Sequence, residues 1–164
     1  MIIKGAKVLT EQFQTQIADV RFQDTILEIG NISPTAGEKV IDASGKFLIP
    51  GLVDIHTHGA IGYDANDPSC DWKKWRNYLL ANGITTFLPT TVTATPKEID
   101  AALARLEESD GINLEGPFLS AEKKGAHAEE KITEVDVKLL EKHKNQIKIT
   151  TIAPEVGNNL EKIH

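Results

Sequence analysis

The sequence predicts an α/β fold, with a small N-terminal β-sheet followed by the N-terminal part of a (β/α)8 barrel of the TIM type. Residues 1–48 contain only short β-patterned segments, whereas strand-like and helix-like segments alternate from residue 49 onward. Repeated β-α units imply a parallel sheet with right-handed crossovers. The unusual polar residues of this second part fall where the predicted strands end, and β/α barrels place their active sites at these ends.

A doubly wound sheet is the alternative, because it also binds ligands at the carboxyl ends of its strands. No glycine-rich phosphate-binding fingerprint follows the first strand of the second part, so the barrel is favoured. A complete barrel needs about 250 residues, and the 164 residues here supply only about four β-α units. Such a half barrel would leave two open sheet edges and an uncovered inner face. We therefore expect the sequence to be the N-terminal part of a longer protein.

The first 48 residues contain four predicted strands and no candidate chemistry. Apolar residues alternate along these segments, and turn-forming residues such as Gly30-Asn31 and Ser33-Pro34 separate them. The predicted strands cover residues 2–9, 18–22, 25–29 and 39–42. Together they would form a small sheet, which we expect to be a separate domain.

Residues 50–58, Pro-Gly-Leu-Val-Asp-Ile-His-Thr-His, form the predicted first strand of the barrel, a buried strand that ends in two histidines. Side chains alternate between the two faces of a strand, so Asp54, His56 and His58 share one face. Two imidazoles on one face can bind a divalent cation or help to bridge two. Structural histidines are the alternative, but His-x-His at the end of an apolar strand is the more specific pattern and favours a metal site.

Helices and strands alternate after the histidine strand. Helical spacing of Trp72, Trp75 and Leu79 predicts a helix that stops at Gly83. Thr95-Pro96-Lys97-Glu98 combines a capping box with proline at the first helical position, and Thr133 is expected to open a further helix. Further strands are predicted at 84–89, 111–117 and 147–154. The polar residues at the strand ends are then His56, His58, Thr90, Glu115 and Glu155.

Glu115 ends the strand in Leu-Glu-Gly-Pro, where Gly116-Pro117 imposes a bend that would aim its carboxylate. A solvated loop glutamate is the alternative. Together with the two histidines, Glu115 completes a nitrogen and oxygen ligand set that suits Zn or Fe. Such a metal activates water and polarises a carbonyl group, so the predicted chemistry is hydrolysis of an amide or ester. The basic stretch 123–127, which ends in His127, follows from the same strand; it is either solvated or in contact with an anion or sugar.

The composition limits the classes of protein to which this sequence can belong. The sequence is 40% apolar and 26% charged, typical of a globular domain, and its net charge of −6 argues against a general nucleic-acid surface. The single cysteine, Cys70, excludes an intramolecular disulfide. No apolar run reaches transmembrane length, and the N-terminus lacks signal-peptide architecture. We expect a cytoplasmic enzyme with no membrane or nucleic-acid partner.

Several of these motifs carry a resemblance. The segment 50–58 resembles the entry strand of the amidohydrolase superfamily. Gly-Ile-Thr-Thr-Phe-Leu-Pro-Thr-Thr, Leu-Glu-Gly-Pro-Phe-Leu and Lys-Lys-Gly-Ala-His resemble the N-acetylglucosamine-6-phosphate deacetylase family within it, and the similarity extends over the whole chain. The resemblance implies a barrel flanked by a small β-sandwich, to which residues 1–48 would contribute strands and residues 49–164 the first half of the barrel. It also implies removal of acetate from a sugar phosphate, and a homodimer.

The resemblance assigns roles residue by residue. Glu115 matches the principal metal ligand, and His56 and His58 match ligands of a second metal in two-metal members, so one or two metals per site are expected. Ala126 and His127 match substrate contacts. The family's two further metal-binding histidines, its phosphate-contacting arginine and its catalytic aspartate have no counterpart in this sequence. We therefore expect residues 1–164 alone to be inactive. Asn113 departs from the family, in which histidine often precedes Leu-Glu-Gly-Pro.

Two other functions remain open. One is hydrolysis of a cyclic amide by a dihydroorotase-like enzyme, which would carry a bridging lysine on the fourth barrel strand. Lys148 lies early in that strand, whereas Glu115 fills the ligand role, so the deacetylase is favoured. The other is a non-catalytic binding module.

Overall fold

The computed structural model describes residues 1–163 and divides into two compact units, Met1–Pro50 and Gly51–His164. Each unit has its own core and is described by itself. No helix within the described part of the chain has the length and apolar character needed to cross a membrane.

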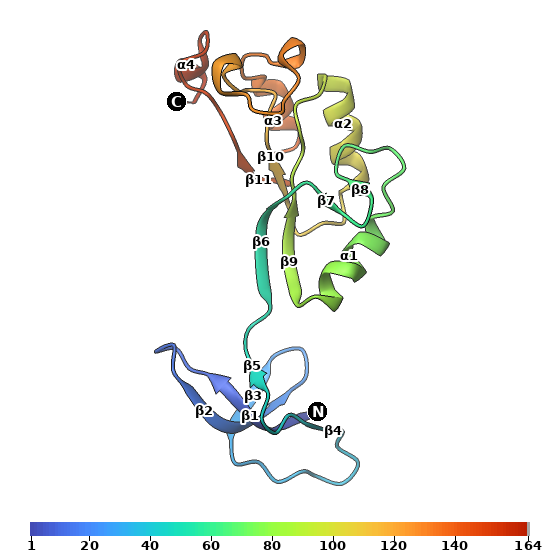
Figure 1. The fold of residues 1–164 in the computed structure, drawn as a ribbon, viewed down its shortest axis with the longest axis vertical. Helices are drawn as coiled ribbons and strands as arrows, with labels where there is room; N and C mark the ends of the chain where they lie inside the picture. Colours follow the sequence, from blue (N-terminus) through green and yellow to red (C-terminus); the bar gives the residue numbers. More distant parts are fainter. Residues whose placement is uncertain (164) are drawn as a thin grey trace. The chain divides into compact units, whose positions relative to one another are not determined.

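The first unit is a five-stranded sheet (Figure 1). β2 pairs with β1 and β3 in antiparallel fashion, and β4 and β5 both pair with β1 in parallel. The four strands predicted from the sequence are confirmed, and β5 was missed because two residues carry no periodicity. The strands are β1 (Ile2–Leu9), β2 (Thr15–Phe22), β3 (Ile26–Gly30), β4 (Val40–Asp42) and β5 (Phe47–Leu48).

One face of this sheet forms a largely apolar groove of about 480 Å³. Ile3, Val8, Val20, Ile29 and Leu48 are among the residues that line it. Ile26 and Ile29 leave about half or more of their surface exposed, although aliphatic side chains of this size are usually buried. The sheet therefore presents an apolar face that no other element of the first unit covers.

The second unit alternates strands and helices, as the sequence predicts. β6 pairs with β9 and β10 with β11, both in parallel, and a parallel bridge between Thr90 and Asn113 joins the two pairs. The carboxyl ends of β6, β9 and β10 therefore meet at one edge. The elements are β6 (Leu52–Thr57), β7 (Gly59–Ala60), β8 (Tyr63–Asp64), α1 (Trp72–Ala81), β9 (Ile84–Pro89), α2 (Pro96–Arg105), β10 (Ile112–Leu114), two short 3-10 helices (Ala121–Lys123 and Glu129–Lys131), α3 (Val137–Lys142), β11 (Ile147–Thr150) and α4 (Asn159–Ile163).

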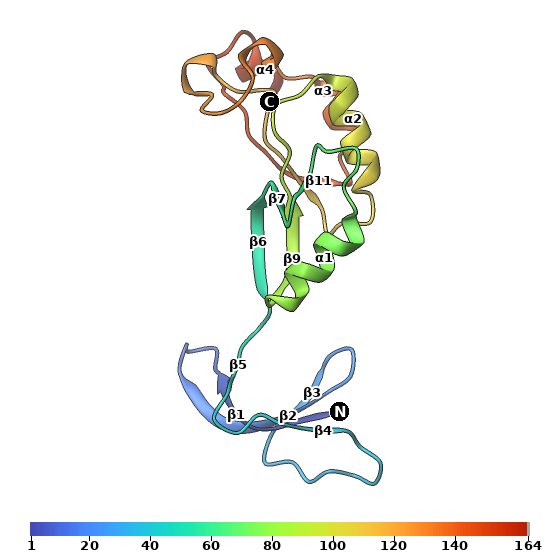
Figure 2. The same ribbon diagram turned by 45° about the vertical axis from the view of Figure 1, so that its right-hand side comes forward.

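The core of the second unit lies between its helices and strands. Helices α1 and α2 lie on the same side of β6 and β9 in both ribbon views (Figures 1 and 2). Phe87 of β9 stacks on Trp72 with ring centroids 4.9 Å apart and also contacts Trp75. Helix α2 contributes an apolar stripe to this core, since Ile99, Ala102, Leu103 and Leu106 are all buried. This packing holds β9 and β10 in place at the centre of the unit.

Three details of the sequence prediction are wrong. β6 is not a buried strand: Leu52, Val53 and Ile55 are each more than half exposed, because β9 is its only paired neighbour in the described chain. Helix α3 begins at Val137 and not at Thr133, since the carboxylate of Asp136 caps it by accepting from the Leu139 N–H. The third and fourth barrel strands are both shorter than predicted: β10 ends at Leu114 and not at residue 117, and β11 ends at Thr150 and not near residue 154.

The capping box of α2 provides a testable contribution to stability. The Glu98 N–H donates to the Thr95 hydroxyl, and the Glu98 carboxylate accepts from the Thr95 N–H at 2.8 Å. Thr95→Ala should lower the free energy of unfolding by about 1 kcal/mol. The Thr95 N–H and hydroxyl, with Lys131, lower the pKa of Glu98 from 4.5 to about 2.

The sign of the pH dependence follows from this lowered pKa. The carboxylate stabilises the folded state fully above pH 4.5, and this contribution is lost as the pH falls towards 2. Denaturant unfolding between these pH values should show a smaller pH dependence in Glu98→Gln than in the parent protein.

The matched control for Thr95→Ala is Thr95→Ser, which keeps the hydroxyl. Equal stability of Thr95→Ala and Thr95→Ser would contradict the capping contribution.

Candidate metal centre

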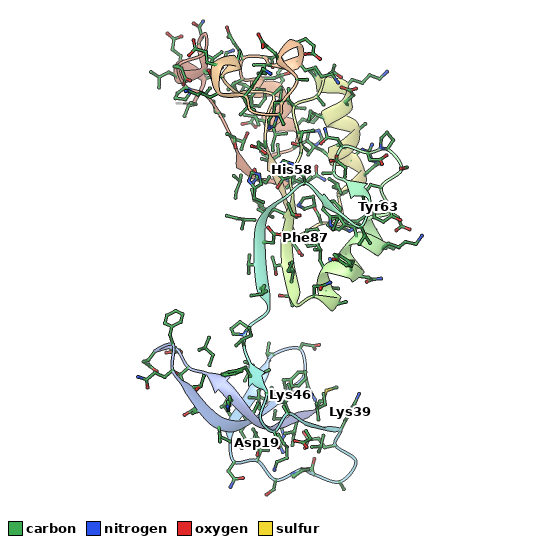
Figure 3. All side chains as sticks on the ribbon, viewed as in Figure 1. Asp19, Lys39, Lys46, His58, Tyr63 and Phe87 are labelled. Atoms are coloured by element: carbon green, nitrogen blue, oxygen red, sulfur yellow. The ribbon has the colours of Figure 1, made fainter. Side chains whose placement is uncertain are left out.

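Parallel strand ends bring His56, His58 and Glu115 together. His56 lies in β6, His58 follows its end (Figure 3), and Glu115 follows β10 directly. The Nε2 atoms of both histidines lie 3.1 Å from Oε2 of Glu115. These three residues form the group within the described chain whose ligand atoms are close enough to hold one metal ion. The sequence prediction that they lie close together is thus met.

The environment of Glu115 indicates what this site binds. Oε2 of Glu115 is buried and has no hydrogen-bond partner among residues 1–163. The ring of His58 is oriented by the Thr90 carbonyl oxygen, to which Nδ1 donates at 3.0 Å. Since Nδ1 carries this proton, Nε2 of neutral His58 presents a lone pair to the carboxylate. Two acceptor atoms at this distance repel each other unless a proton or a metal ion lies between them, and a metal ion would be shared by all three residues.

The distances also fit a metal ion. Zinc–nitrogen and zinc–oxygen bonds are about 2.0–2.2 Å long, so two ligands at tetrahedral angles lie about 3.3 Å apart. The two nitrogen–oxygen separations of 3.1 Å are close to this value. The imidazole rings of His56 and His58 meet edge to face at 84°, so their Nε2 atoms converge on the carboxylate from different directions. The residues present therefore fit a divalent metal ion.

Asn113 supports this centre from β10. Its side chain is buried, and its amide donates to the Ile55 carbonyl oxygen at 2.9 Å. The same amide nitrogen lies 3.4 Å from Nδ1 of His56. Asn113 thus links β10 to β6. It occupies the position before Leu-Glu-Gly-Pro at which the family named in the sequence analysis often has histidine.

Gly116 explains how Glu115 can turn into the site. Its φ of +69° lies in the left-handed region, which glycine adopts without strain. A Cβ atom at this position would lie 2.1 Å from Oγ1 of Thr93. Both the backbone angle and this close approach require glycine, so the bend that the sequence predicts after Glu115 is present.

His127 lies beside the three candidate ligands but outside their group. Its Nε2 is 3.6 Å from Oε1 of Glu115, the carboxylate oxygen that the other two histidines do not approach. Its Nδ1 accepts from the Thr93 N–H at 3.0 Å and lies 2.8 Å from the Thr93 hydroxyl. The side chain is only 11% exposed, so the solvated alternative for the basic stretch 123–127 does not apply to His127.

The other residues that the sequence analysis singled out lie in different environments. Ala126 is exposed and directly precedes His127 in a turn that the His127 N–H closes by donating to Lys124. Thr90 is buried and orients His58. Glu155 is exposed in a turn after β11 and is not in the His56–His58–Glu115 group. The sequence reasoning missed Thr93, whose only signal is its place in the Thr-Thr-Val-Thr run after β9.

Curated relatives are similar to this chain along nearly its whole length. The chain is 33% identical to the N-acetylglucosamine-6-phosphate deacetylase of Bacillus subtilis over 189 aligned positions, covering 99% of this chain and 46% of the relative. It is 27% identical to the N-acetylgalactosamine-6-phosphate deacetylase of Escherichia coli O157:H7, covering 99% and 46%. The chain therefore spans about half the length of the curated relatives it matches.

Solved structures give the same result. The N-acetylglucosamine-6-phosphate deacetylase of Thermotoga maritima superposes with a TM-score of 0.83 at 28% identity, covering 98% of this chain and 44% of that one. A D-hydantoinase from Bacillus sp. AR9 superposes with a TM-score of 0.57 at 23% identity, covering 99% and 41%, which indicates a shared fold. The predicted fold, the N-terminal part of a β/α barrel, is confirmed by these matches.

The sequence profile of the amidohydrolase family matches residues 47–162. This range includes the histidine strand, Glu115 and His127, so it contains the whole candidate centre. Because the match covers more than half of the sequence, the chain belongs to the amidohydrolase family.

Proposed function

We propose that this chain is part of an enzyme that hydrolyses N-acetyl-D-glucosamine 6-phosphate to acetate and D-glucosamine 6-phosphate. The observation that carries the proposal is the convergence of Glu115, His56 and His58 at the strand ends of an amidohydrolase. The names of the matched relatives supply the substrate class, an N-acetylated hexosamine phosphate.

Each residue of the candidate centre has a proposed task. Glu115 and His58, together with His56, hold one or two divalent ions, Zn or Fe, through the oxygen and nitrogen atoms described above. When bound, such an ion activates water for attack and polarises the acyl carbonyl group. Thr90 orients His58, and Gly116 permits the turn of Glu115.

His127 and Ala126 are proposed to contact the substrate. The His127 ring lies on the Oε1 side of Glu115, away from the oxygen that the other histidines approach. A sugar bound over the centre would therefore meet His127 next to the carbonyl group that reacts. Ala126 is exposed directly beside it and offers a small surface against which a sugar ring can lie.

The wider context of the enzyme follows from the same proposal. Residues 1–48 would contribute strands to a small β-sandwich, and the uncovered apolar groove of the first unit supports this, because a sandwich buries one face of each sheet. Residues 49–164 would form the first half of the barrel. We propose a cytoplasmic homodimer with no nucleic-acid or membrane partner, in keeping with the net charge of −6 and the single cysteine.

The other candidate functions have less support. Cyclic-amide hydrolases such as the D-hydantoinase match this chain in fold, but Lys148 lies near the start of β11 and its ammonium donates to the Asn145 carbonyl oxygen. That lysine is thus engaged away from the strand ends. A non-catalytic binding module would not need three converging candidate metal ligands.

Acetate release tests the proposal directly. The complete enzyme should release acetate from N-acetylglucosamine 6-phosphate in a reaction that stops when a chelator removes the metal and resumes when Zn or Fe is returned. N-acetylgalactosamine 6-phosphate and a hydantoin are the comparison substrates. Preference for the galactosamine substrate would change the sugar assignment, and hydrolysis of the hydantoin alone would refute deacetylation.

His127→Ala tests the proposed substrate contact. The substitution should lower kcat/KM by about tenfold or more, since a hydrogen bond to the reacting part of the substrate is lost. Metal content should remain that of the parent protein, because His127 is outside the group of candidate ligands. Metal analysis alongside steady-state kinetics separates these effects, and loss of metal would reassign His127 as a ligand.

A further inference from the structure

Thr93 contacts the ring of His127 through two polar groups at once. Its backbone N–H donates to Nδ1 at 3.0 Å, and its hydroxyl oxygen lies 2.8 Å from the same nitrogen. Thr93 is buried, with 5% of its surface exposed. The contact joins the loop after β9 to the loop after β10, across 34 residues of sequence.

The backbone N–H of Thr93 decides where the proton of His127 lies. An amide N–H can only donate, so Nδ1 must offer a lone pair to it. A neutral imidazole carries one proton, which is then on Nε2. The hydroxyl of Thr93 can donate to the same lone pair, whereas a proton on Nδ1 would point at the amide hydrogen.

We propose that Thr93 is a positioning residue that holds His127 in the tautomer with the proton on Nε2, so that His127 presents a hydrogen-bond donor to an oxygen atom of the substrate. This inference rests on the proposed function for the identity of that oxygen, which belongs to the acetamido group. His127 then stabilises charge on the substrate oxygen and does not act as a metal ligand or a general base through Nε2.

The surroundings of Nε2 agree with this tautomer. Oε1 of Glu115 lies 3.6 Å away, and a carboxylate oxygen is favoured next to an N–H group and disfavoured next to a lone pair. The ammonium of Lys124 is engaged by the backbone carbonyl oxygen of His127 and not by its ring. The charged group that faces Nε2 is therefore an acceptor.

Gly116 makes room for the hydroxyl of Thr93. A Cβ atom at this glycine would lie 2.1 Å from Oγ1 and 3.0 Å from Cα of Thr93. The glycine that allows Glu115 to turn into the centre also lets Thr93 approach His127. The candidate metal ligand and the candidate substrate contact are thus positioned by one close packing of the loops that follow β9 and β10.

Nitrogen-15 NMR of the complete enzyme tests the tautomer without reference to activity. Histidine-labelled protein at mildly alkaline pH, metal-free and zinc-loaded, should show a protonated Nε2 and an unprotonated Nδ1 for His127, assigned by the signals missing in His127→Gln. A proton on Nδ1 would overturn the inference whatever the substrate proves to be. The expected tautomer in a protein that deacetylates no sugar phosphate would uphold the positioning role and refute the proposed function.

Two matched substitutions at His127 test whether its Nε2 atom donates a hydrogen bond to the substrate. Glutamine places an amide nitrogen near the position of Nε2, whereas asparagine places one near Nδ1. His127→Gln should therefore keep at least about tenfold more kcat/KM than His127→Asn, with equal metal content. Equal activity of the two variants would contradict donation from Nε2.

The hydroxyl of Thr93 is tested in the same way. Thr93→Val should lower kcat about threefold to tenfold while metal content is unchanged, and Thr93→Ser should restore it. The Nε2 proton should persist in Thr93→Val, because the backbone N–H remains. Full activity of Thr93→Val, or failure of Thr93→Ser to restore activity, would overturn the contribution of the hydroxyl, and loss of the Nε2 proton in Thr93→Val would overturn the assignment of the tautomer to the backbone N–H.

Discussion

Glu115→Gln should abolish metal binding and deacetylase activity together while the protein remains folded. The carboxylate is the sole anionic group on which His56 and His58 converge, and its Oε2 atom has no hydrogen bond within residues 1–163 that the substitution could break. A neutral amide removes the negative charge that attracts a divalent cation. Changes beyond the direct ligands of a metal typically cost 10–100-fold in affinity, so loss of a ligand should cost more than about 100-fold.

Metal analysis and circular dichroism of the same preparation check this expectation. The matched control is Glu122→Gln, an exposed glutamate on the short helix Ala121–Lys123, which should keep both metal and activity. Normal metal content in Glu115→Gln would show that the carboxylate is not a ligand. Unfolding of that variant would instead assign Glu115 a structural role.

The parts of the fold that the sequence predicts well are those with strong local signals. Helix α2 has a capping box, proline at its first position and a regular apolar stripe, and each of these features is present. The strand β9 was bounded correctly because three β-branched residues, Ile84–Thr86, and two large apolar residues lead to the proline that ends it. Such elements are specified by neighbours within a few residues, so local reasoning suffices.

The remaining features depend on contacts between distant segments. The exposure of β6 reflects how many strands flank it, and an apolar run carries no information on that number. Helix α3 begins at Val137 because the side chain of Asp136, and not the hydroxyl of Thr133, caps its first turn. Both residue types are good caps, so sequence alone could not decide between them.

In the candidate centre, too, some features could be predicted from the sequence and others depend on contacts between distant segments. His56, His58 and Glu115 could be placed together from topology, because parallel strands end at one edge. The role of Thr93 could not be predicted, since it depends on a backbone N–H that any residue other than proline supplies. Only the packing of the two loops, for which Gly116 makes room, shows that this N–H faces His127.

Residues 1–164 produced as an isolated polypeptide should show no deacetylase activity, even with Zn or Fe supplied. Amide hydrolysis needs a positioned group that protonates the departing amine. Asp54 and Asp64 accept from the N–H groups of His56 and Asn66, so both carboxylates are engaged by the backbone two residues further along the chain. His127, beside the centre, accepts from the Thr93 N–H through Nδ1, so in the tautomer proposed above its Nε2 carries the proton and cannot act as a base.

The phosphate group also lacks an arginine partner among residues 1–163. Arg21 pairs with Glu28 and Glu38 in the first unit, and Arg105 donates to the carbonyl oxygens of Ala101 and Asn66. Arg76 lies within α1, away from the strand ends. None of these arginines can therefore bind a phosphate above Glu115 without giving up its place in the fold.

The exposed apolar surface of β6 should make the isolated polypeptide self-associate. Val53 and Ile55 are 65% and 53% exposed, and the free edge of the strand offers unpaired backbone groups. The test combines acetate release with added metal and light scattering to measure size in solution. Turnover comparable with that of the complete enzyme would show that the acid and the phosphate contact lie within these residues. A stable monomer would show that the open edge of β6 is covered by the chain itself.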